Sequence, residues 1–348
     1  MPAINPKSGL LIINLGSPKA LDLESVKSYL TEFLMDPYVI DVPVWLRWIL
    51  VKWLIVPSRS PKTLEAYQSV WTDQGSALIQ ITQAFAKSLK GHTKARIGVA
   101  MRYQEPSIES GIRDLLDAGV DAIYLAPMYP HYAMASTKTV TQKCQEVLKK
   151  WGVQLPVYTL SPFYQDPHYI QSLATSVLPH LTGDWDFLLC SYHGVPVRHL
   201  KKADPTQKHC WIQKNCCETP CQEAWAHCYN HQLKVTTKLL QKQLNIPDSK
   251  IGISYQSRLG ADEWLKPPTT EELERLAKSG VKHIKVICPA FVADCLETLE
   301  EIAKEAKEIF IQAGGESFEC IPCLNDESYW VDAFSKMILS PGAFEPLR

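Results

Sequence analysis

Three groups of side chains in this sequence have types and spacings that could carry chemistry, and the first is a single histidine. His193 follows the apolar segment DFLLCSY and precedes Gly194. It is therefore expected at the carboxyl end of a buried strand, where sheets of parallel strands bind ligands. An imidazole there could accept a proton or ligate a metal ion, because its pKa lies near neutrality. The alternative is a loop histidine whose ring is hydrogen-bonded to the backbone.

A row of carboxylates forms the second group. Asp294 and Glu297 are predicted to open a helix, and their spacing of three residues would place both on one face. Glu301 continues that face one turn later. Such a row could accept protons or guide a cation. It could equally complement the positive end of the helix dipole.

Cysteines form the third group. The chain has 11 cysteines, and an even spread would place fewer than one of them in residues 210–228, which hold five. Four thiolates could hold a [2Fe–2S] cluster, and zinc is the main rival because histidines lie nearby. A structural cysteine patch without metal is the third possibility. The candidate ligands are Cys210, Cys217, Cys221 and Cys228, with Cys216 as an alternative to Cys217, and the nearby histidines are His209, His227 and His231.

The segment Val44–Val56, VWLRWILVKWLIV, is apolar on all sides of a predicted helix and lies between Pro43 and Pro57. It is too short to span a bilayer. Apolar residues all round a helix favour burial in a core. The alternative is an exposed lip whose tryptophans contact a membrane surface or a large flat ligand, with Arg47 and Lys52 for anionic headgroups.

The composition is typical of a folded protein of about two domains. The chain has 348 residues, 46% of them apolar, with 36 Lys and Arg against 37 Asp and Glu. A net charge of −1 argues against a broad nucleic-acid footprint. The amino-terminal stretch lacks the features of a signal peptide, and no apolar run approaches the roughly 20 residues of a membrane span. We therefore expect a cytoplasmic protein whose cysteines are reduced.

Short apolar runs alternate with helical patterns along the whole chain. This alternation predicts an α/β fold of two Rossmann-like, doubly wound lobes, each with a four-stranded parallel sheet. The absence of a P-loop and of a GxGxxG motif argues against ATP and NAD as ligands. The predicted strands are Leu10–Asn14, Arg96–Met101, Asp121–Ala126, Pro156–Leu160, Asp186–Tyr192, Lys250–Tyr255, His283–Cys288 and Ser317–Ile321. The predicted domains are residues 1–165, residues 166–324 with a cysteine-rich insertion at 205–232, and a helical segment at 325–348 that packs back on the first lobe.

Six motifs follow one another along the chain. They read LIINLGSP, MRYQEPSIE, PMYPHYAMAST, SYHGVP, YQSRLGADEWLKPPT and CPAFVADCLETLEEI. In order and spacing they resemble the ferrochelatase family, from about Gly9 to Asn325. The resemblance is closest to the bacterial enzymes, which insert Fe²⁺ into protoporphyrin IX and form protohaem in the last step of haem biosynthesis. It implies the class II chelatase fold, with a porphyrin cleft between the two lobes, and it implies protoporphyrin IX and ferrous iron as the partners.

The resemblance also implies roles for single residues. His193 would take a pyrrole proton or briefly ligate the iron, and Glu297 and Asp294 would carry protons away. His193 and Glu297 would thus also be ligands of the substrate Fe²⁺. The family's lip falls at about Phe33–Val56, which favours the exposed lip and a peripheral contact with the membrane surface. The implied porphyrin-binding residues are Leu15, Arg102, Tyr103, Gln256, Ser257, Trp264 and Phe291, of which Arg102 and Tyr103 would hold the opposite face or a propionate.

Two departures from the family pattern bear on the cysteines. Met134 stands where animal enzymes place a cluster cysteine, and the last cysteine is Cys323, so the chain has no cysteine-rich tail. An animal-type cluster is therefore excluded. The Cys210–Cys228 stretch instead resembles the internal segment in which some microbial members hold a [2Fe–2S] cluster, and this favours the cluster over zinc.

Rival functions stay open at this point. One is a chelatase for another tetrapyrrole, such as coproporphyrin III or sirohydrochlorin, or for another metal. The other is a haem or porphyrin carrier that performs no catalysis. A carrier would bind the macrocycle without inserting iron.

Overall fold

The computed structural model describes residues 4–258, 260 and 262–347. Residues 1–3 of the amino-terminal stretch, Leu259 and Ala261 of the motif YQSRLGADEWLKPPT, and Arg348 lie outside the described residues. The chain divides into two compact units. The first comprises Met1–Met128, Met134–Ser161 and Asp326–Arg348, and the second comprises Tyr129–Ala133 and Pro162–Asn325. The segment Tyr129–Ala133 thus belongs to the second unit, although the sequence placed it in the first domain.

The sheet of the first unit is built on β1 (Ser8–Gly16), whose Leu10–Ile13 stretch has no exposed surface. A strand covered on both faces requires such a continuous apolar run. β1 pairs in parallel with β2 (Arg96–Tyr103) and β3 (Ala122–Pro127), and β3 pairs with β4 (Val157–Leu160). The sheet order is β2-β1-β3-β4-β9, in which β9 (Phe344–Pro346) is antiparallel to β4. The four parallel strands confirm the prediction, and the fifth strand corrects the expected count.

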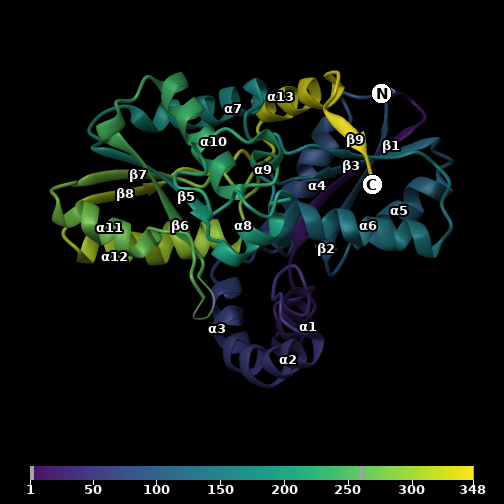
Figure 1. Cartoon of the computed structure of the whole chain (residues 1–348), viewed down its shortest axis with the longest axis horizontal. Coiled ribbons are helices and arrows are strands. Elements are labelled where there is room, and N and C mark those ends of the chain that lie inside the picture. Colours follow the sequence, from purple (N-terminus) through teal and green to yellow (C-terminus); the bar gives the residue numbers. More distant parts are fainter. Residues whose placement is uncertain (1–3, 259, 261, 348) are drawn as a thin grey trace. The chain divides into compact units, whose positions relative to one another are not determined.

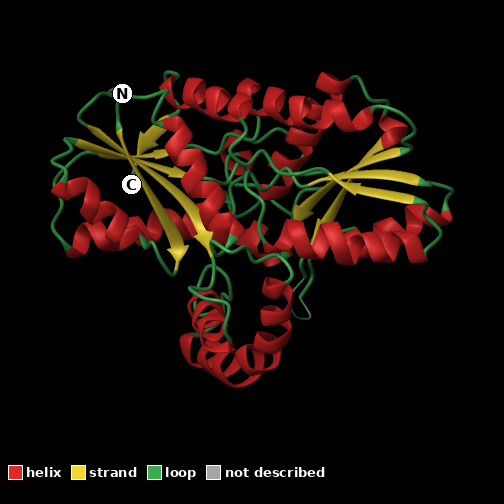
Figure 2. Cartoon of the chain, turned by 180° about the vertical axis from the view of Figure 1, so that it is seen from behind, coloured by secondary structure: helices red, strands yellow, loops and turns green. Residues whose placement is uncertain are grey.

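Helices cover both faces of this first sheet (Figures 1 and 2). α4 (Ala77–Leu89) packs on β1 and β2, and α13 (Ser328–Leu339) packs on α4. α5 (Ile108–Asp117) packs on the same strands and contacts α6 (Thr139–Lys150). The ring of Phe85 lies 5.2 Å from that of Phe334 and 6.1 Å from that of Trp330. The carboxyl-terminal segment therefore completes the core of the first unit.

The second unit holds a four-stranded parallel sheet in the order β6-β5-β7-β8. Its strands are β5 (Phe187–His193), β6 (Ile251–Gln256), β7 (His283–Ile287) and β8 (Ser317–Cys320). α7 (Pro167–Val177) and α10 (Tyr229–Leu244) lie on one side of this sheet, and α11 (Thr269–Lys278) and α12 (Lys307–Gln312) lie on the other (Figure 1). The wide helical turns of η5 (Glu297–Ala306), a π-helix, run directly into α12. All eight predicted strands are confirmed to within two residues at each end.

A helical projection extends from the first unit. It consists of α1 (Leu23–Leu34), α2 (Val44–Ile49), the π-helical η1 (Leu50–Ile55) and α3 (Val56–Gln68), with α1 packed against α3. α2 lies at the tip of the projection, away from the sheet of its unit (Figure 1). Among residues 4–258, 260 and 262–347, none of the helices has the length and apolar character needed to cross a membrane.

The tip of this projection exposes large apolar side chains. Trp45 and Trp53 are 67% and 68% exposed, and Trp48 contacts Trp53 with ring centroids 6.4 Å apart. The burial that an all-round apolar helix favours is therefore wrong for this segment, although Val51 is buried. We call Val44, Trp45, Trp48, Ile49, Trp53 and Leu54 the tryptophan lip.

Arg47 corrects one expectation for the lip. Its side chain is buried, and its guanidinium donates to the carbonyl oxygens of Met35 at 3.2 Å and Val42 at 3.3 Å. It therefore ties α2 to the loop before it and is not available to an anionic headgroup. Lys52 is exposed, as expected.

The end of β1 depends on a glycine. Gly16 has a φ of +109°, and a Cβ there would lie 2.0 Å from the carbonyl oxygen of Tyr103. No other residue fits such a close approach in this backbone region. The pairing of β1 with β2 therefore continues to Gly16 and Tyr103, which keeps Leu15 and Arg102 at the same edge of the sheet.

Candidate functional site

The carboxyl ends of the strands in the second unit gather the residues that the sequence singled out. His193 ends β5 and is the register partner of Gln256, which ends β6. Phe291 follows β7, and its ring lies 6.4 Å from the imidazole of His193 at an angle of 60°. The amide of Gln256 reaches the carbonyl oxygen of Glu297 at 3.5 Å. His193, Gln256, Phe291 and Glu297 therefore lie together around one edge of this sheet.

The imidazole of His193 has one committed nitrogen. Its Nδ1 lies 2.7 Å from the carbonyl oxygen of Gly194. Because a carbonyl oxygen only accepts, Nδ1 carries the hydrogen in the neutral ring, and the lone pair is on Nε2. The backbone hydrogen bond that the alternative predicts is therefore present at Nδ1. It does not involve Nε2, whose lone pair can accept a proton.

Gly194, the residue that follows His193, packs closely against its neighbours. Its N–H donates to the carbonyl oxygen of Gln256 at 2.7 Å. A Cβ at this position would lie 3.0 Å from that same oxygen and 3.2 Å from the ring of Trp264. The indole of Trp264 can therefore approach the backbone beside His193.

Glu301 is the carboxylate with the most distinctive surroundings. It accepts a hydrogen bond from the backbone N–H of Ser257 at 2.7 Å and another from the Ser257 hydroxyl. Burial is the largest influence on this group and raises the pKa of Glu301, and the neighbouring Glu297 raises it further, while Ser257 and His193 oppose the change. Ser257 reaches this position with a φ of +65°, a strained backbone conformation of the kind found at functional sites.

Asp294 does not belong to this row. The helix begins after it, at Leu296 and Glu297, so the expectation that Asp294 and Glu297 share one helix face is wrong. The Asp294 carboxylate accepts from the hydroxyl of Thr298 at 2.8 Å and from the amide of Asn325 at 2.7 Å. It thus closes the start of η5 and ties it to the loop after β8.

Gln256 and the residues behind it form a buried polar network. Gln256 is 3% exposed, and its amide oxygen accepts from the hydroxyl of Ser191 at 2.8 Å. Ser191 is also 2.9 Å from the hydroxyl of Thr269, which in turn lies 2.9 Å from that of Ser254. The network links β5, β6 and α11 directly behind His193.

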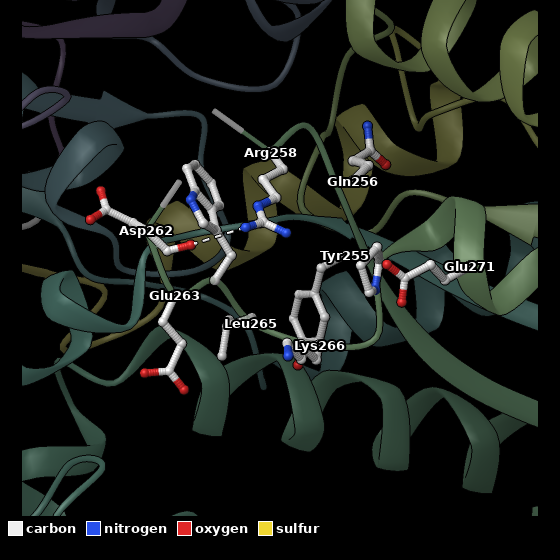
Figure 3. A pocket seen from close by; sticks show the side chains of 11 residues that line it. Tyr255, Gln256, Arg258, Asp262, Glu263, Leu265, Lys266 and Glu271 are labelled. Atoms are coloured by element: carbon white, nitrogen blue, oxygen red, sulfur yellow. Dashed lines mark hydrogen bonds between the residues drawn. The ribbon is translucent and has the colours of Figure 1, made fainter. Parts of the chain in front are cut away.

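A pocket of about 340 Å³ opens beside Gly194 and Gln256 (Figure 3). Trp264 lines it, and the indole N–H is buried without a hydrogen-bond partner. Figure 3 shows the guanidinium of Arg258 among the lining groups, bonded at 3.4 Å to the carbonyl oxygen of Asp262. The charged residues of this lining were not predicted, since residues of a loop follow no periodic pattern. They are Arg258, Asp262, Glu263, Lys266 and Glu271.

In the first unit, a buried carboxylate organises Arg102 and Tyr103. The carboxylate of Asp36 accepts from the Arg102 guanidinium at 2.5 Å, from the Tyr103 hydroxyl at 2.9 Å and from the hydroxyl of Thr139. The ring of Tyr103 has no exposed surface. Leu15 is partly buried at the end of β1. Asp36 was missed, and its only signal was a lone carboxylate in the apolar stretch FLMDPYVI.

The cysteine-rich segment lies between α8 (Val197–Ala203) and α10 and contains the short α9 (Gln222–Trp225). The thiols of Cys217 and Cys228 contact each other, and Cys228 also contacts Cys210. The contact with Cys210 is the main reason that the pKa of Cys228 is raised to about 12. Cys210 and Cys228 are buried around Ala224, with Cys217 and Cys221 packed against them. The structure thus brings together all four predicted ligands.

Donors and histidines surround these thiols. The sulfur of Cys217 accepts from the Asn230 amide at 3.4 Å, and that of Cys216 accepts from the backbone N–H of Trp211 at 3.4 Å. Within the part of the chain that the structure describes, no group of three or more His, Cys, Asp or Glu side chains is arranged to hold a metal ion. Each nearby histidine directs a ring nitrogen at a carbonyl oxygen: His209 at Cys216, His231 at Cys217 and His227 at Glu223.

Comparisons with known proteins agree with the motifs. A family model described as Ferrochelatase matches residues 7–341. The chain is 44% identical to a ferrochelatase of Pseudomonas fluorescens over 329 residues, which cover 94% of this chain and 96% of that one. It is 45% identical to a ferrochelatase of Opitutus terrae over 338 residues, which cover 96% and 97%.

Solved structures support the fold. SirB from Bacillus subtilis with Fe³⁺ matches with a TM-score of 0.54 and 12% identity, over 94% of this chain and 93% of that one. The sirohydrochlorin chelatase SirB in complex with cobalt, from the subspecies spizizenii, matches with a TM-score of 0.53 and 12% identity, over 94% and 92%. This likeness confirms the predicted chelatase fold with two parallel sheets.

The Asp36 network predicts a large effect on stability. Asp36→Ala leaves the mostly buried guanidinium of Arg102 and the Tyr103 hydroxyl without this acceptor, and removal of one partner from such a pair costs about 3–5 kcal/mol. Urea unfolding of the two proteins measures this loss. The control is Asp332→Ala, which removes an exposed carboxylate paired with Lys336 and should cost less than about 1 kcal/mol. Equal losses in the two variants would contradict the role of Asp36.

Proposed function

Because the chain belongs to the ferrochelatase family, we propose that it inserts Fe²⁺ into protoporphyrin IX and releases two protons to form protohaem, the last step of haem biosynthesis. The membership that the motifs predict is confirmed by the family match and the relatives. The observation that carries the proposal is that His193, at the end of β5, has its Nδ1 bonded to the backbone and interacts electrostatically with Glu301 of η5, which also lies near Glu297.

The reaction requires a base near the pyrrole nitrogens. A planar macrocycle keeps its nitrogen lone pairs in the ring plane, so binding that bends the ring exposes them to the metal. Two N–H bonds break and the metal gains bonds to the ring nitrogens, without any change of redox state. Nε2 of His193, whose Nδ1 hydrogen is held by Gly194, would accept a pyrrole proton or briefly ligate the iron.

The carboxylates would take the protons onward. Glu297 lies one residue into the helix start, and Glu301 follows four residues later. A carboxylate whose pKa is raised holds a proton more readily at neutral pH and can pass it on. We assign the second carboxylate of the path to Glu301, since both oxygens of Asp294 are engaged by Thr298 and Asn325.

Some of the remaining predicted residues would contact the porphyrin, and the others would hold those residues in position. Leu15, Phe291 and Trp264 are partly exposed and apolar, which suits a large flat macrocycle. Ser257 would act through Glu301. Arg102 would meet the porphyrin or a propionate. Tyr103 and Gln256 are buried and would hold Arg102 and His193 in place from behind.

We also propose that the cysteine-rich segment holds a [2Fe–2S] cluster through Cys210, Cys217, Cys221 and Cys228, with Cys216 as an alternative to Cys217. The proposal is supported by the contacts among Cys210, Cys217 and Cys228, by the packing of Cys221 against them, and by N–H donors to the sulfurs of Cys217 and Cys216. The cluster would contribute stability or sensing, since ligation couples to folding. Zinc is the rival occupant.

We further propose that the protein is cytoplasmic and that it touches the membrane surface through the tryptophan lip. Six large apolar side chains are exposed at one tip, beside the exposed Lys52. A contiguous exposed apolar patch of this kind typically marks an interaction site. Indoles and a lysine are the side chains that favour a membrane interface with anionic headgroups.

Replacement of the proposed base tests the activity. Anaerobic incubation with Fe²⁺ and protoporphyrin IX is followed by loss of porphyrin fluorescence and appearance of haem absorbance. His193→Ala should lower turnover by about 10²-fold or more while porphyrin binding remains. Glu297→Gln should slow turnover more than it weakens binding, and His180→Ala, a surface change in the same unit, should behave like the wild type. Stoichiometric binding without insertion by the wild type would instead support a carrier, and faster turnover with coproporphyrin III would change the substrate.

Metal analysis tests the cluster. Protein purified without oxygen should be brown, with broad visible absorption and equal amounts of iron and acid-labile sulfide. Cys228→Ser should lose both, whereas Cys144→Ser, at a buried cysteine of the first unit, should keep them. A colourless protein that contains zinc would refute the cluster.

Vesicle binding tests the lip. The double variant Trp45→Ala, Trp53→Ala removes two indoles that would leave water on binding and should lower co-sedimentation with vesicles containing anionic lipid by at least about tenfold. The control is Leu178→Ala, Leu339→Ala, which removes exposed apolar side chains elsewhere. The membrane contact would be wrong if both double variants bound as the wild type does.

A further inference from the structure

The cysteine-rich segment is attached to the loop of His193 at both of its ends. At its start, α8 begins four residues after His193, and Asp204, which follows α8, accepts from the backbone N–H groups of His209 at 2.8 Å and Cys210 at 2.9 Å. The start of the segment is therefore bonded to the residue that ends α8, the first helix after His193.

The end of the segment makes a more direct connection. Cys228 is the N-cap of α10, and the next residue, Tyr229, is buried and donates its hydroxyl to the carbonyl oxygen of His193 at 3.0 Å. That carbonyl belongs to the peptide between His193 and Gly194. The neighbouring Gly194 carbonyl oxygen accepts from Nδ1 of the His193 ring. A hydrogen bond that fixes this backbone therefore also helps to fix the position of the imidazole.

Asn230 provides a parallel link. Its amide nitrogen donates to the sulfur of Cys217 at 3.4 Å, and its amide oxygen accepts from the hydroxyl of Tyr255 at 2.7 Å. Tyr255 precedes Gln256 on β6, whose carbonyl oxygen receives the Gly194 N–H. The Asn230 side chain thus connects the thiol of Cys217 to β6, the strand paired with the one that ends at His193.

At the start of α10, three consecutive residues therefore make contacts with three different parts of the unit. Consecutive residues of a helix point about 100° apart, so Cys228 faces the thiols, Tyr229 faces the His193 backbone and Asn230 bridges to β6. Gln232 fixes this turn, because its amide donates to the carbonyl oxygens of Trp225 and Ala226 and its oxygen accepts from the N–H of Tyr132. A displacement of Cys228 would move the turn as one body.

We propose that Tyr229 and Asn230 are positioning residues that couple the thiols of the cysteine-rich segment to the backbone of His193. The state of these thiols, bound to a metal group or free, thereby adjusts the placement of the imidazole. The inference rests on the proposed role of His193, and it holds for either metal occupant of the segment. A misplacement of about 1 Å at a reacting group can cost about 10²-fold in rate, so small shifts suffice.

A double-mutant cycle tests this coupling. Tyr229→Phe keeps the ring and removes the hydroxyl, Cys217→Ser disturbs the thiols, and the third protein carries both changes. Each single change should lower kcat by roughly tenfold with KM for porphyrin unchanged, and the double variant should lose no more than either single variant. Tyr229→Phe should keep the metal content of the wild type. The control is Tyr124→Phe, at a buried tyrosine of the first unit, with unchanged kcat.

Amide hydrogen exchange supplies a readout that does not need turnover. The Gly194 amide, bonded to Gln256, should exchange faster in Tyr229→Phe and in Cys217→Ser than in the wild type and in Tyr124→Phe. Equal exchange in all four proteins, or losses of kcat that multiply in the double variant, would overturn the coupling. If the wild type inserts no iron but the Gly194 amide responds as expected, the proposed function fails and the coupling stands.

Discussion

The parallel pairing of β5 with β6 is the constraint on which the rest of the site depends. It sets His193 beside Gln256 and brings the Gly194 N–H to the Gln256 carbonyl oxygen, so the backbone on both sides of the histidine is fixed by main-chain hydrogen bonds. The buried hydroxyls of Ser191 and Thr269 then satisfy the Gln256 side chain from behind. The ring of His193 is then held through Nδ1 by the Gly194 carbonyl oxygen, which leaves the lone pair on Nε2 of the neutral ring. A general base requires a fixed backbone and a ring nitrogen that can accept a proton.

Carboxylates in this protein differ in function according to how many donors surround them. Asp36 receives four donors, which include a guanidinium and the backbone N–H of Tyr38. Burial raises the pKa of Asp204, but backbone N–H groups and the Thr206 hydroxyl lower it further, to about 2. A carboxylate with a lowered pKa, such as Asp204, stays anionic at neutral pH. Glu301 has fewer compensating donors for its burial and lies near another carboxylate, so its pKa moves in the opposite direction. The surroundings of a carboxylate therefore move its pKa in either direction within this protein.

Much of this arrangement follows from sequence, and the exceptions have physical causes. Buried parallel strands are continuous apolar runs, so all eight were recognisable, and the strand-end rule then placed His193. Strand β9 has only three residues, too few for a periodic signal. Asp294 was assigned to a helix because spacing shows which residues could share a face but not where the helix begins, and here it begins at Leu296. Arg47 was expected to meet anionic headgroups as part of an exposed lip, yet its guanidinium donates to two carbonyl oxygens of the preceding residues inside the protein. Contacts that join distant segments, such as Asp36 with Arg102, leave no local pattern to read.

The cysteine-rich segment shows how an insertion can be both separate from a fold and attached to its chemistry. It adds no strand to the sheet of the second unit, and its own hydrogen bonds and thiol contacts hold it together. It nevertheless enters the chain a few residues after His193 and returns through α10, whose first turn donates to the His193 carbonyl. That hydrogen bond is partly buried beside the His193 ring, and an acceptor left without its donor in such a place carries a free-energy cost of up to about 1–3 kcal/mol. The geometry of the base and the order of the segment are therefore linked by a hydrogen bond that neither can lose without affecting the other.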